Sequence, residues 1–375
     1  MTGFRVVIGG GGIAAVEALL RLRRLVGDAV DVTMIAPDAE LRYRPLAVQE
    51  PFAGPGARRY ALARIAGDTG AAFVHDALEW VDPDGQAVHT LAGEQYPFDA
   101  LLLAYGARSA PPHEHAVTFD DANADETYLG IVRSIEGGYT KHLGLIVPTG
   151  HAWPLPVYEL ALQTADRAYD SGFDDVTVTV VTPEAAPLEV FGTAVSEAAR
   201  EALVDAGVRL LTGARAEVPA HRTLVVDPGG HELEPETIVA LPRIEGRALR
   251  GVAADADGFI PIDDRCRVQG MGEHVFAAGD ATSFPVKQGG IGAQQADVAA
   301  AGIAALAGDH EPARFEPVLR GSLIAGERRR LYFQARLEDG RAVESEVLDE
   351  PPWEAGEKVV AEELGPYLAK LGSRG

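Results

Sequence analysis

The stretch FRVVIGGGGIAA, residues 4–15, decides the fold of this 375-residue chain. Residues 4–8 predict a buried strand, and residues 13–25 predict the helix that follows it. Between them Gly10, Gly12 and Ala15 form a G-x-G-x-x-A pattern. Such a pattern allows a tight turn, a close approach of the backbone to a pyrophosphate, and close packing of helix on strand. The unpaired N–H groups at the helix start favour phosphate groups, so the pattern predicts a dinucleotide site.

A second segment, about 270 residues later, complements the first. VFAAGD (residues 275–280) predicts an apolar strand that ends at Gly279 and Asp280, and KQGG (residues 287–290) leads into an alanine-rich helix. Together the two segments resemble the two-dinucleotide-domain flavoproteins. This group is the FAD-dependent pyridine nucleotide-disulfide oxidoreductase superfamily, which includes type II NADH dehydrogenases, sulfide:quinone oxidoreductases and ferredoxin reductases. The resemblance implies FAD as cofactor, Asp280 on its ribityl chain, and the helix start near Gly290 directed at the flavin pyrimidine ring.

The whole pattern predicts an α/β fold with two Rossmann-like dinucleotide-binding domains, the second inserted in the first, plus a small C-terminal α+β tail. We expect the FAD-binding domain at residues 1–125 and 241–310, the second domain at 126–240, and the tail at 311–375. Pro111, Pro112 and the acidic run 120–126 predict the first linker. The resemblance covers roughly residues 1–310.

A third motif and the tail complete the predicted organisation. LLLAYG, residues 101–106, predicts a buried strand ending in a turn at Gly106, and Tyr105 replaces the threonine of the Ala-Thr-Gly turn found in the superfamily. Residues 259–262 predict another strand, residues 330–337 a strand of the tail, and residues around 357–371 its final helix. We expect that helix to pack on the body of the protein or on a partner subunit. The second alternative would make the protein a homodimer.

Composition narrows the partners and the compartment. The formal net charge of −23 disfavours nucleic acid and anionic membrane surfaces, because both carry negative charge. No leader precedes the first strand, and the apolar runs are shorter than the ~20 residues that span a bilayer. We therefore expect a cytoplasmic nucleotide-binding protein whose partners are small-molecule electron donors and acceptors, with no stable membrane insertion.

Cys266 is the sole cysteine of the chain. It can form no intrachain disulfide, and no cysteine-containing metal cluster is expected. Disulfide reductases and sulfide:quinone oxidoreductases of the superfamily use a pair of cysteines beside the flavin, so the resemblance does not carry that chemistry to this chain.

The second domain departs from the nucleotide-binding pattern. After a strand predicted at residues 143–147, the sequence PTGHAWPLP keeps only Gly150 of three glycine positions, and Trp153 occupies the position where the helix must approach closely. Prolines remove N–H donors that a pyrophosphate needs, so NAD(P)H binding in the usual pose is disfavoured. Glu184, after the next predicted strand, has two interpretations: a ligand of an adenosine ribose or a solvated loop residue.

Three residues are candidates for the catalytic site. His151 is a candidate proton donor beside the flavin, because imidazole titrates near neutral pH, or an ordinary loop histidine. Trp153 would stack near the flavin or belong to the core. Lys287 would stabilise the anionic reduced flavin near N1 and C2=O, or it is a solvated lysine.

The loop after the second strand supplies further candidates for cofactor binding. Arg42 and Arg44 would neutralise the diphosphate, or they are surface arginines, and Pro45 would lie against the flavin ring. Ala36 stands where relatives have an acidic residue that holds the ribose 2′-OH. Asp38, Glu40, backbone or water would have to serve instead.

These observations predict an FAD-dependent oxidoreductase. A two-electron donor reduces the flavin, and an unidentified acceptor, with a quinone as one candidate, reoxidises it. Two rivals stay open: an NAD(P)H dehydrogenase with an atypical nucleotide site, and a non-catalytic flavin-binding electron carrier or redox-sensing partner protein. An open donor pocket would favour an enzyme, whereas a flavin sealed by Trp153 and the tail would favour a carrier.

Overall fold

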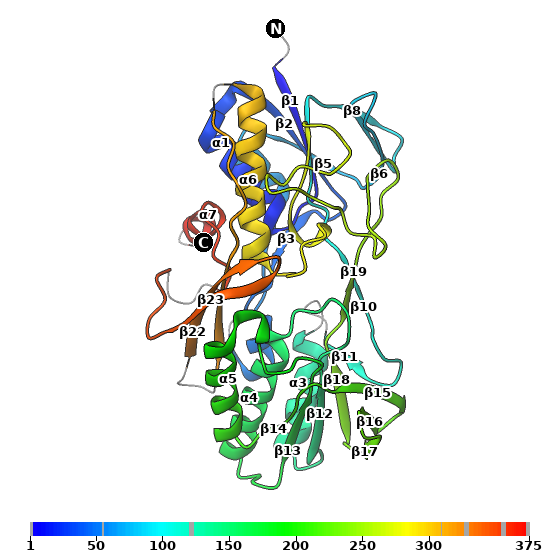
Figure 1. The fold of residues 1–375 in the computed structure, drawn as a ribbon, viewed down its shortest axis with the longest axis vertical. Helices are drawn as coiled ribbons and strands as arrows, with labels where there is room; N and C mark the ends of the chain where they lie inside the picture. Colours follow the sequence, from blue (N-terminus) through cyan, green and yellow to red (C-terminus); the bar gives the residue numbers. More distant parts are fainter. Residues whose placement is uncertain are drawn as a thin grey trace.

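The chain builds two parallel sheets that lie toward opposite ends of an elongated molecule (Figure 1). The structure is a computed structural model that describes residues 3–372, with gaps at 55, 120–123, 309, 326–329 and 354–357. The acidic run 120–126, predicted as a linker, lies largely outside the described residues.

The first sheet has five parallel strands in the order β20-β9-β1-β2-β5. All four residues of β9 are buried, as in parallel sheets covered on both faces. Because β20 pairs with β9, a late part of the chain re-enters the first sheet, which confirms the predicted insertion. The strands are β1 (Phe4–Gly9), β2 (Val30–Ala36), β5 (Ala72–His75), β9 (Ala100–Leu103) and β20 (Val275–Ala277).

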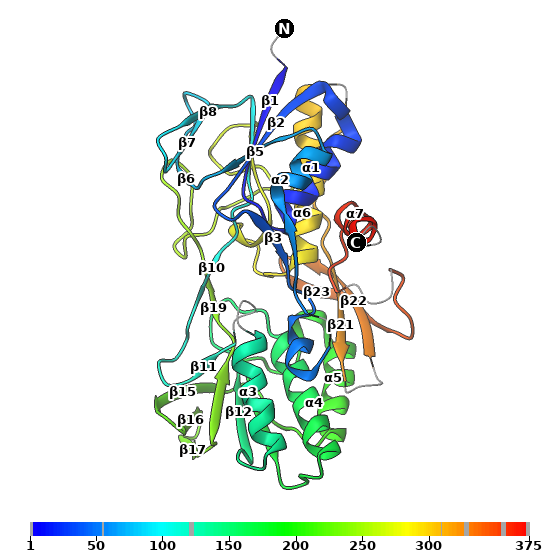
Figure 2. The ribbon, with the colours of Figure 1, turned by 180° about the vertical axis from the view of Figure 1, so that it is seen from behind.

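Two helices lie side by side against this sheet (Figures 1 and 2). Helix α1 (Ile13–Val26) buries an alanine- and leucine-rich face, and Arg23 and Arg24 complement the helix dipole in its last turn. Helix α6 (Gly289–Ala307) packs along α1, and its small residues allow the close approach. The domain also contains α2 (Leu62–Asp68), the pair β3 (Glu40–Tyr43) and β4 (Arg58–Ala61), and the small sheet β6 (Leu78–Asp82), β7 (Ala87–Thr90) and β8 (Gln95–Pro97).

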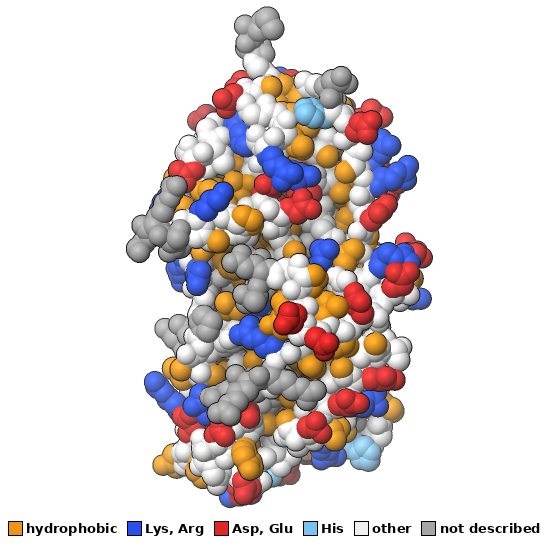
Figure 3. All heavy atoms as spheres, turned by 90° about the vertical axis from the view of Figure 1, so that its left-hand side faces the viewer, with side chains coloured by type: hydrophobic (Ala, Val, Ile, Leu, Met, Phe, Trp, Pro, Cys, Tyr) orange, Lys and Arg blue, Asp and Glu red, His pale blue; other side chains and the backbone are white. Residues whose placement is uncertain are grey.

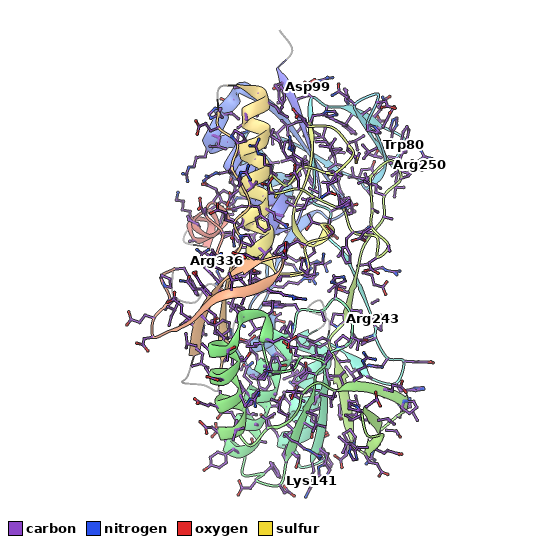
Figure 4. The ribbon with its side chains drawn as sticks, viewed as in Figure 1. Trp80, Asp99, Lys141, Arg243, Arg250 and Arg336 are labelled. Atoms are coloured by element: carbon purple, nitrogen blue, oxygen red, sulfur yellow. The ribbon has the colours of Figure 1, made fainter. Side chains whose placement is uncertain are left out.

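The small sheet is attached to the rest of the domain by an aromatic contact. The guanidinium of Arg250 lies 4.5 Å from the ring centroid of Trp80 (Figure 4). The ring of His89 stacks on Trp80, with 3.8 Å between the two ring centroids. This contact joins β6 to the loop after β19.

The second sheet is also parallel, in the order β11-β18-β12-β13-β14. Helix α4 (Leu155–Asp170) covers this sheet with its apolar face. An antiparallel pair, β10 (Arg108–Ala110) and β19 (Arg243–Glu245), runs between the two sheets (Figure 1). The other elements are β11 (Val117–Thr118), α3 (Ala124–Glu136), β12 (His142–Ile146), β13 (Thr177–Val181), α5 (Thr193–Asp205), β14 (Arg209–Leu211), β15 (Arg215–Ala220), β16 (Thr223–Asp227), β17 (His231–Leu233) and β18 (Thr237–Ala240). The domain boundaries stay a prediction, and the one at 125/126 falls inside α3.

The tail is a three-stranded antiparallel sheet and a short helix: β21 (Val318–Ile324), β22 (Arg330–Glu338), β23 (Arg341–Leu348) and α7 (Leu364–Gly372). The final helix begins later than predicted, because Pro366 is tolerated only in a first helical turn. Leu364 and Leu368 are buried in the core of the first domain, so α7 packs on the body of the protein.

One predicted strand is wrong. Residues 259–262 form only isolated bridges, such as Ile262 with Val268. Between these two residues the chain turns through Cys266, which is buried and has a φ of 57°. The turn leaves too few residues for a continuous strand.

Charged side chains of both signs mix over the face shown in Figure 3. Within the described residues, no helix is long and apolar enough to cross a membrane, and no group of three or more metal-ligating side chains is found.

Candidate active site

The glycine-rich turn after β1 places the N-terminus of α1 against the end of β9. Gly10 has a φ of +139°, and a Cβ there would lie 2.1 Å from the carbonyl oxygen of Ala104, so only glycine fits. Gly12 caps α1, and a Cβ there would meet nothing within 4 Å, so its backbone faces open space. Ala15 is fully buried between α1 and its neighbours. The positions of Gly10, Gly12 and Ala15 are compatible with the dinucleotide-binding roles predicted from the sequence. Those roles stay predictions.

The second glycine segment lies directly beside the first. Gly279 has a φ of +79°, and a Cβ there would lie 3.1 Å from the Cβ of Ala14 in α1. Its N–H donates to Oε1 of Gln295 at 2.8 Å, which ties the end of β20 to α6. Gln288 caps α6 by accepting a hydrogen bond from the N–H of Ile291 at 2.9 Å. Gly290 is buried in the first turn of α6.

Two cavities extend from these turns and share the walls formed by Arg42 and Arg44. The glycine chamber, about 520 Å³, is lined by Gly10, Gly11, Gly12 and residues that include Ala36, Tyr105 and Gly106. The lysine chamber, about 340 Å³, is lined by Asp280, Lys287, Gly289 and residues that include Pro45, Trp153 and Lys358. Both arginines therefore lie where the two chambers meet, at the middle of an elongated site.

Lys287 is buried, not solvated, which excludes that interpretation of the sequence. Its ammonium donates to the carbonyl oxygen of Thr282 and lies 3.6 Å from the ring centroid of Phe259. Burial lowers the pKa of Lys287 to about 8, although Asp280 and Asp255 favour its charged form. Burial likewise raises the pKa of Asp280, and Lys287 opposes that shift. Both residues line the lysine chamber, and each favours the charged form of the other.

A buried ion pair completes the lysine chamber, and the sequence did not reveal it. Glu159 of α4 and Lys358 of the tail are 1% and 9% exposed. The ammonium of Lys358 donates to both carboxylate oxygens at 2.5 and 2.6 Å, and the N–H of Ile324 donates to Oε1 at 3.1 Å. Burial raises the pKa of Glu159, and Lys358 opposes the rise. A glutamate on the apolar face of α4 was the one available signal.

A third cavity, the outer chamber, lies at the carboxyl ends of β12 and β13 and has a volume of about 810 Å³. Trp153 and Lys287 line both the outer and the lysine chamber. Trp153 also packs on Phe191, with 5.9 Å between the two ring centroids. The turn between β22 and β23, at Gly340, forms part of the far wall. Trp153 is thus both a core residue and a partition between chambers.

His151 lines none of the three chambers, although its neighbours Gly150 and Ala152 line the outer one. Its ring meets the edge of Phe259 at 4.9 Å, and its Nε2 is 3.8 Å from a carboxylate oxygen of Asp257. Because Phe259 also contacts Lys287, one aromatic ring touches both candidate residues. Phe259 was missed at the sequence level, where it carried no functional signal.

Glu184 is not a solvated loop residue. It is buried at the end of β13, where its Oε2 accepts hydrogen bonds from Tyr158 and, at 3.0 Å, from Thr182. Its Oε1 is buried and has no hydrogen-bond partner among the described residues, and the side chain lines the outer chamber. Burial raises the pKa of Glu184 to about 7.

Comparison with known proteins agrees with this geometry. Residues 158–302 match the family model described as pyridine nucleotide-disulphide oxidoreductase. This match supports the resemblance to the FAD-dependent pyridine nucleotide-disulfide oxidoreductase superfamily. An NADH dehydrogenase-like protein of Mycobacterium tuberculosis is 29% identical over 298 residues, which cover 74% of this chain and 72% of the relative.

Solved structures show the same fold. The sulfide:quinone oxidoreductase of Aquifex aeolicus superposes with a TM-score of 0.80 at 19% identity, over 92% of this chain and 87% of that one. A ferredoxin reductase of Rhodopseudomonas palustris gives a TM-score of 0.63 at 18% identity, over 88% and 82% of the two chains.

FAD is the cofactor of this flavoprotein, and the residues present fit it. The glycine chamber offers a turn where a Cβ at Gly10 would strike Ala104, and the N-terminus of α1 suits a pyrophosphate. Arg42 and Arg44 supply positive charge at the middle of the site, and the lysine chamber ends at the N-terminus of α6. The protein is accordingly an FAD-dependent oxidoreductase.

Proposed function

We propose that this oxidoreductase passes two electrons from a small-molecule donor through FAD to a separate acceptor, with a quinone as the candidate acceptor. FAD supplies the two-electron chemistry when bound. The protein supplies access, charge and orientation. The observation that carries the proposal is the shared wall: Trp153 and Lys287 line two chambers, so two reactants can reach the cofactor from different sides.

The lysine chamber suits a flat apolar acceptor. Phe119, Leu155 and Leu241 line it beside the buried pair of Glu159 and Lys358. An apolar cavity with a few convergent polar groups is the usual form of a small-molecule site. Quinone reduction takes up protons as well as electrons, and buried acidic and basic side chains at the wall are groups that can hold them.

The outer chamber supports an enzyme over a sealed electron carrier. A carrier that turns over no small molecule needs no cavity beside its cofactor, whereas a chamber of about 810 Å³ admits a donor next to Trp153. The strong negative charge of the chain opposes docking on anionic lipid, so a cytoplasmic site of action is part of the proposal.

Anaerobic reduction of the purified yellow protein tests the proposal. We expect a small reductant other than a nicotinamide nucleotide, tested beside NADH, NADPH and sulfide, to bleach the flavin absorbance, and a soluble short-chain quinone to restore it. A Leu241→Trp variant, which fills the lysine chamber, should slow reoxidation and leave reduction by donor unchanged. Failure of every quinone to restore the absorbance would reject the acceptor class.

A second candidate, an NAD(P)H dehydrogenase with an atypical nucleotide site, is favoured by one observation. Glu184 follows β13 and lines the outer chamber, and its buried Oε1 has no hydrogen-bond partner among the described residues. An acid after this strand is the group that binds an adenosine ribose in dinucleotide-binding folds. Against it, Pro154 and Pro156 remove N–H donors at the start of α4.

Stopped-flow reduction separates these two candidates. If the donor is not a nicotinamide nucleotide, bleaching by NADH or NADPH should be slow and should not saturate. Fast, saturable bleaching that Glu184→Gln weakens, and that Glu189→Gln in the same wall does not, would establish the dehydrogenase instead.

A further inference from the structure

The adenosine end of the glycine chamber has no acidic residue in the expected place. Ala36, at the end of β2, is buried and lines the chamber. Asp38 and Glu40 also line it, but both are exposed, and Glu40 lies 3.7 Å from Arg59 in an ion pair. A ribose or phosphate at this end must therefore be held by other groups.

Tyr105 offers such a group. It follows β9, lines the glycine chamber, and packs its ring against the core cluster that contains Leu101 and Leu103. Its hydroxyl is buried and has no hydrogen-bond partner among the described residues. A buried polar group without a partner is unfavourable, and a ligand in the chamber that Tyr105 lines would supply the missing partner. Burial raises the pKa of Tyr105 to about 12, so the hydroxyl stays protonated and can donate.

Arg247 adds a positive charge to the same wall. It lies in the loop after β19, is exposed, and lines the glycine chamber. Tyr105 lines the same chamber, and the positive charge of Arg247 opposes the rise in the pKa of Tyr105. The glycine chamber is therefore lined by Arg247 at one place and by Arg42 and Arg44 at its junction with the lysine chamber. Tyr105, which carries a hydroxyl donor, lines the same chamber. A ligand part with several anionic oxygens and hydroxyls fits this chemistry.

We propose that Tyr105 and Arg247 bind the AMP half of FAD and replace the carboxylate that Ala36 lacks. The Tyr105 hydroxyl donates a hydrogen bond to a phosphate or ribose oxygen, and the Arg247 guanidinium balances its negative charge. The inference rests on the assignment of FAD as cofactor. Under this proposal Tyr105, which replaces the threonine of the superfamily's Ala-Thr-Gly turn, is a ligand of the cofactor.

Binding of cofactor fragments to the full-length protein tests the proposal. After removal of FAD, the protein is titrated with FAD, ADP and FMN, and the dissociation constants are measured by calorimetry or flavin fluorescence. Tyr105→Phe should weaken ADP and FAD binding about 5- to 10-fold, as expected for the loss of one hydrogen bond, and leave FMN binding unchanged. Arg247→Met should weaken the same two ligands, more at low than at high salt.

Tyr96→Phe is the matched control, because Tyr96 packs on the same core cluster and does not line the chamber. Its ligand affinities should equal those of the wild type. Thermal melting adds a second readout: without FAD, Tyr105→Phe should melt no lower than the wild type, whereas with saturating FAD it should melt lower.

Unchanged ADP affinity in Tyr105→Phe would overturn the proposal, as would equal losses for FMN and ADP, which would indicate a general distortion. A wild-type protein that binds neither FAD nor ADP would instead overturn the cofactor assignment on which the proposal rests.

Discussion

The ammonium of Lys358 binds both carboxylate oxygens of Glu159 across 199 residues of sequence, at 2.5 and 2.6 Å. The contact joins the C-terminal tail to helix α4 of the inserted domain and lies in the wall of the lysine chamber. A buried pair of this kind contributes little when intact, because desolvation offsets attraction, but the loss of one partner leaves an uncompensated charge.

Lys358→Met should therefore destabilise the flavin-loaded protein by about 3–5 kcal/mol in urea unfolding. The control is Lys141→Met, which breaks an exposed pair with Asp175 and should cost less than about 1 kcal/mol. A double variant, Glu159→Leu with Lys358→Met, should regain most of the loss. Equal effects of the two single lysine variants would contradict the role of burial.

Asp280→Ala should lower the FAD content of the purified protein. Charge-assisted hydrogen bonds are worth about 1.5–3 kcal/mol, so the dissociation constant of FAD should rise at least 10-fold. The measurement is flavin absorbance per protein before and after dialysis. Asp257→Ala, at an exposed position, should keep full occupancy; if the Asp280 variant does so too, the ribityl contact lies elsewhere.

Lys287→Met should make the bound flavin harder to reduce. A cation in the wall of the lysine chamber stabilises negative charge on reduced flavin, and about 1.4 kcal/mol corresponds to roughly 30 mV in a two-electron couple. The midpoint potential should fall by tens of millivolts in a dye-equilibrated titration, while FAD occupancy stays near that of the wild type. Lys287→Arg, which keeps the charge, should shift less, and an unshifted Met variant would remove Lys287 from the site.

Asp297→Asn should flatten the dependence of thermal stability on pH. Burial and the nearby Glu17 together raise the pKa of Asp297 to about 8, although Arg21 opposes the rise. Because the folded state prefers the protonated acid, its stabilising effect is present below about pH 4 and is lost as pH rises through 8.

The wild-type melting temperature should therefore fall between pH 5.5 and 8.5, and the Asp297→Asn variant should show a smaller fall. Asp84→Asn, at an exposed position, should match the wild type. A parallel decline in all three proteins would assign the pH dependence to other groups.

The glycine segments could be predicted from sequence because their chemistry is local. Gly10 and Gly279 occupy backbone conformations with positive φ that favour glycine. A glycine at each position is therefore itself a sign of a turn. Helix α1 could be predicted for a related reason, because its apolar periodicity lies in consecutive residues.

Contacts between distant segments could not be predicted in this way. Nothing in the tail marks Lys358 as the partner of Glu159, because a buried ion pair depends on how three parts of the chain meet. Glu184 was open to two interpretations for the same reason: its burial depends on Tyr158, one helix away. The late start of α7 could have been predicted from the sequence, because a proline at position 366 disfavours a helix that begins several residues earlier.

The pairing of β20 with β9 bears on how the protein acquires its cofactor. During synthesis the Gly10 turn leaves the ribosome about 270 residues before Asp280, so a nascent chain carries half of a binding site and an unpaired strand edge at β9. Such edges invite pairing with other chains until they are covered. We therefore expect FAD to bind only after β20 and α6 have joined the first sheet.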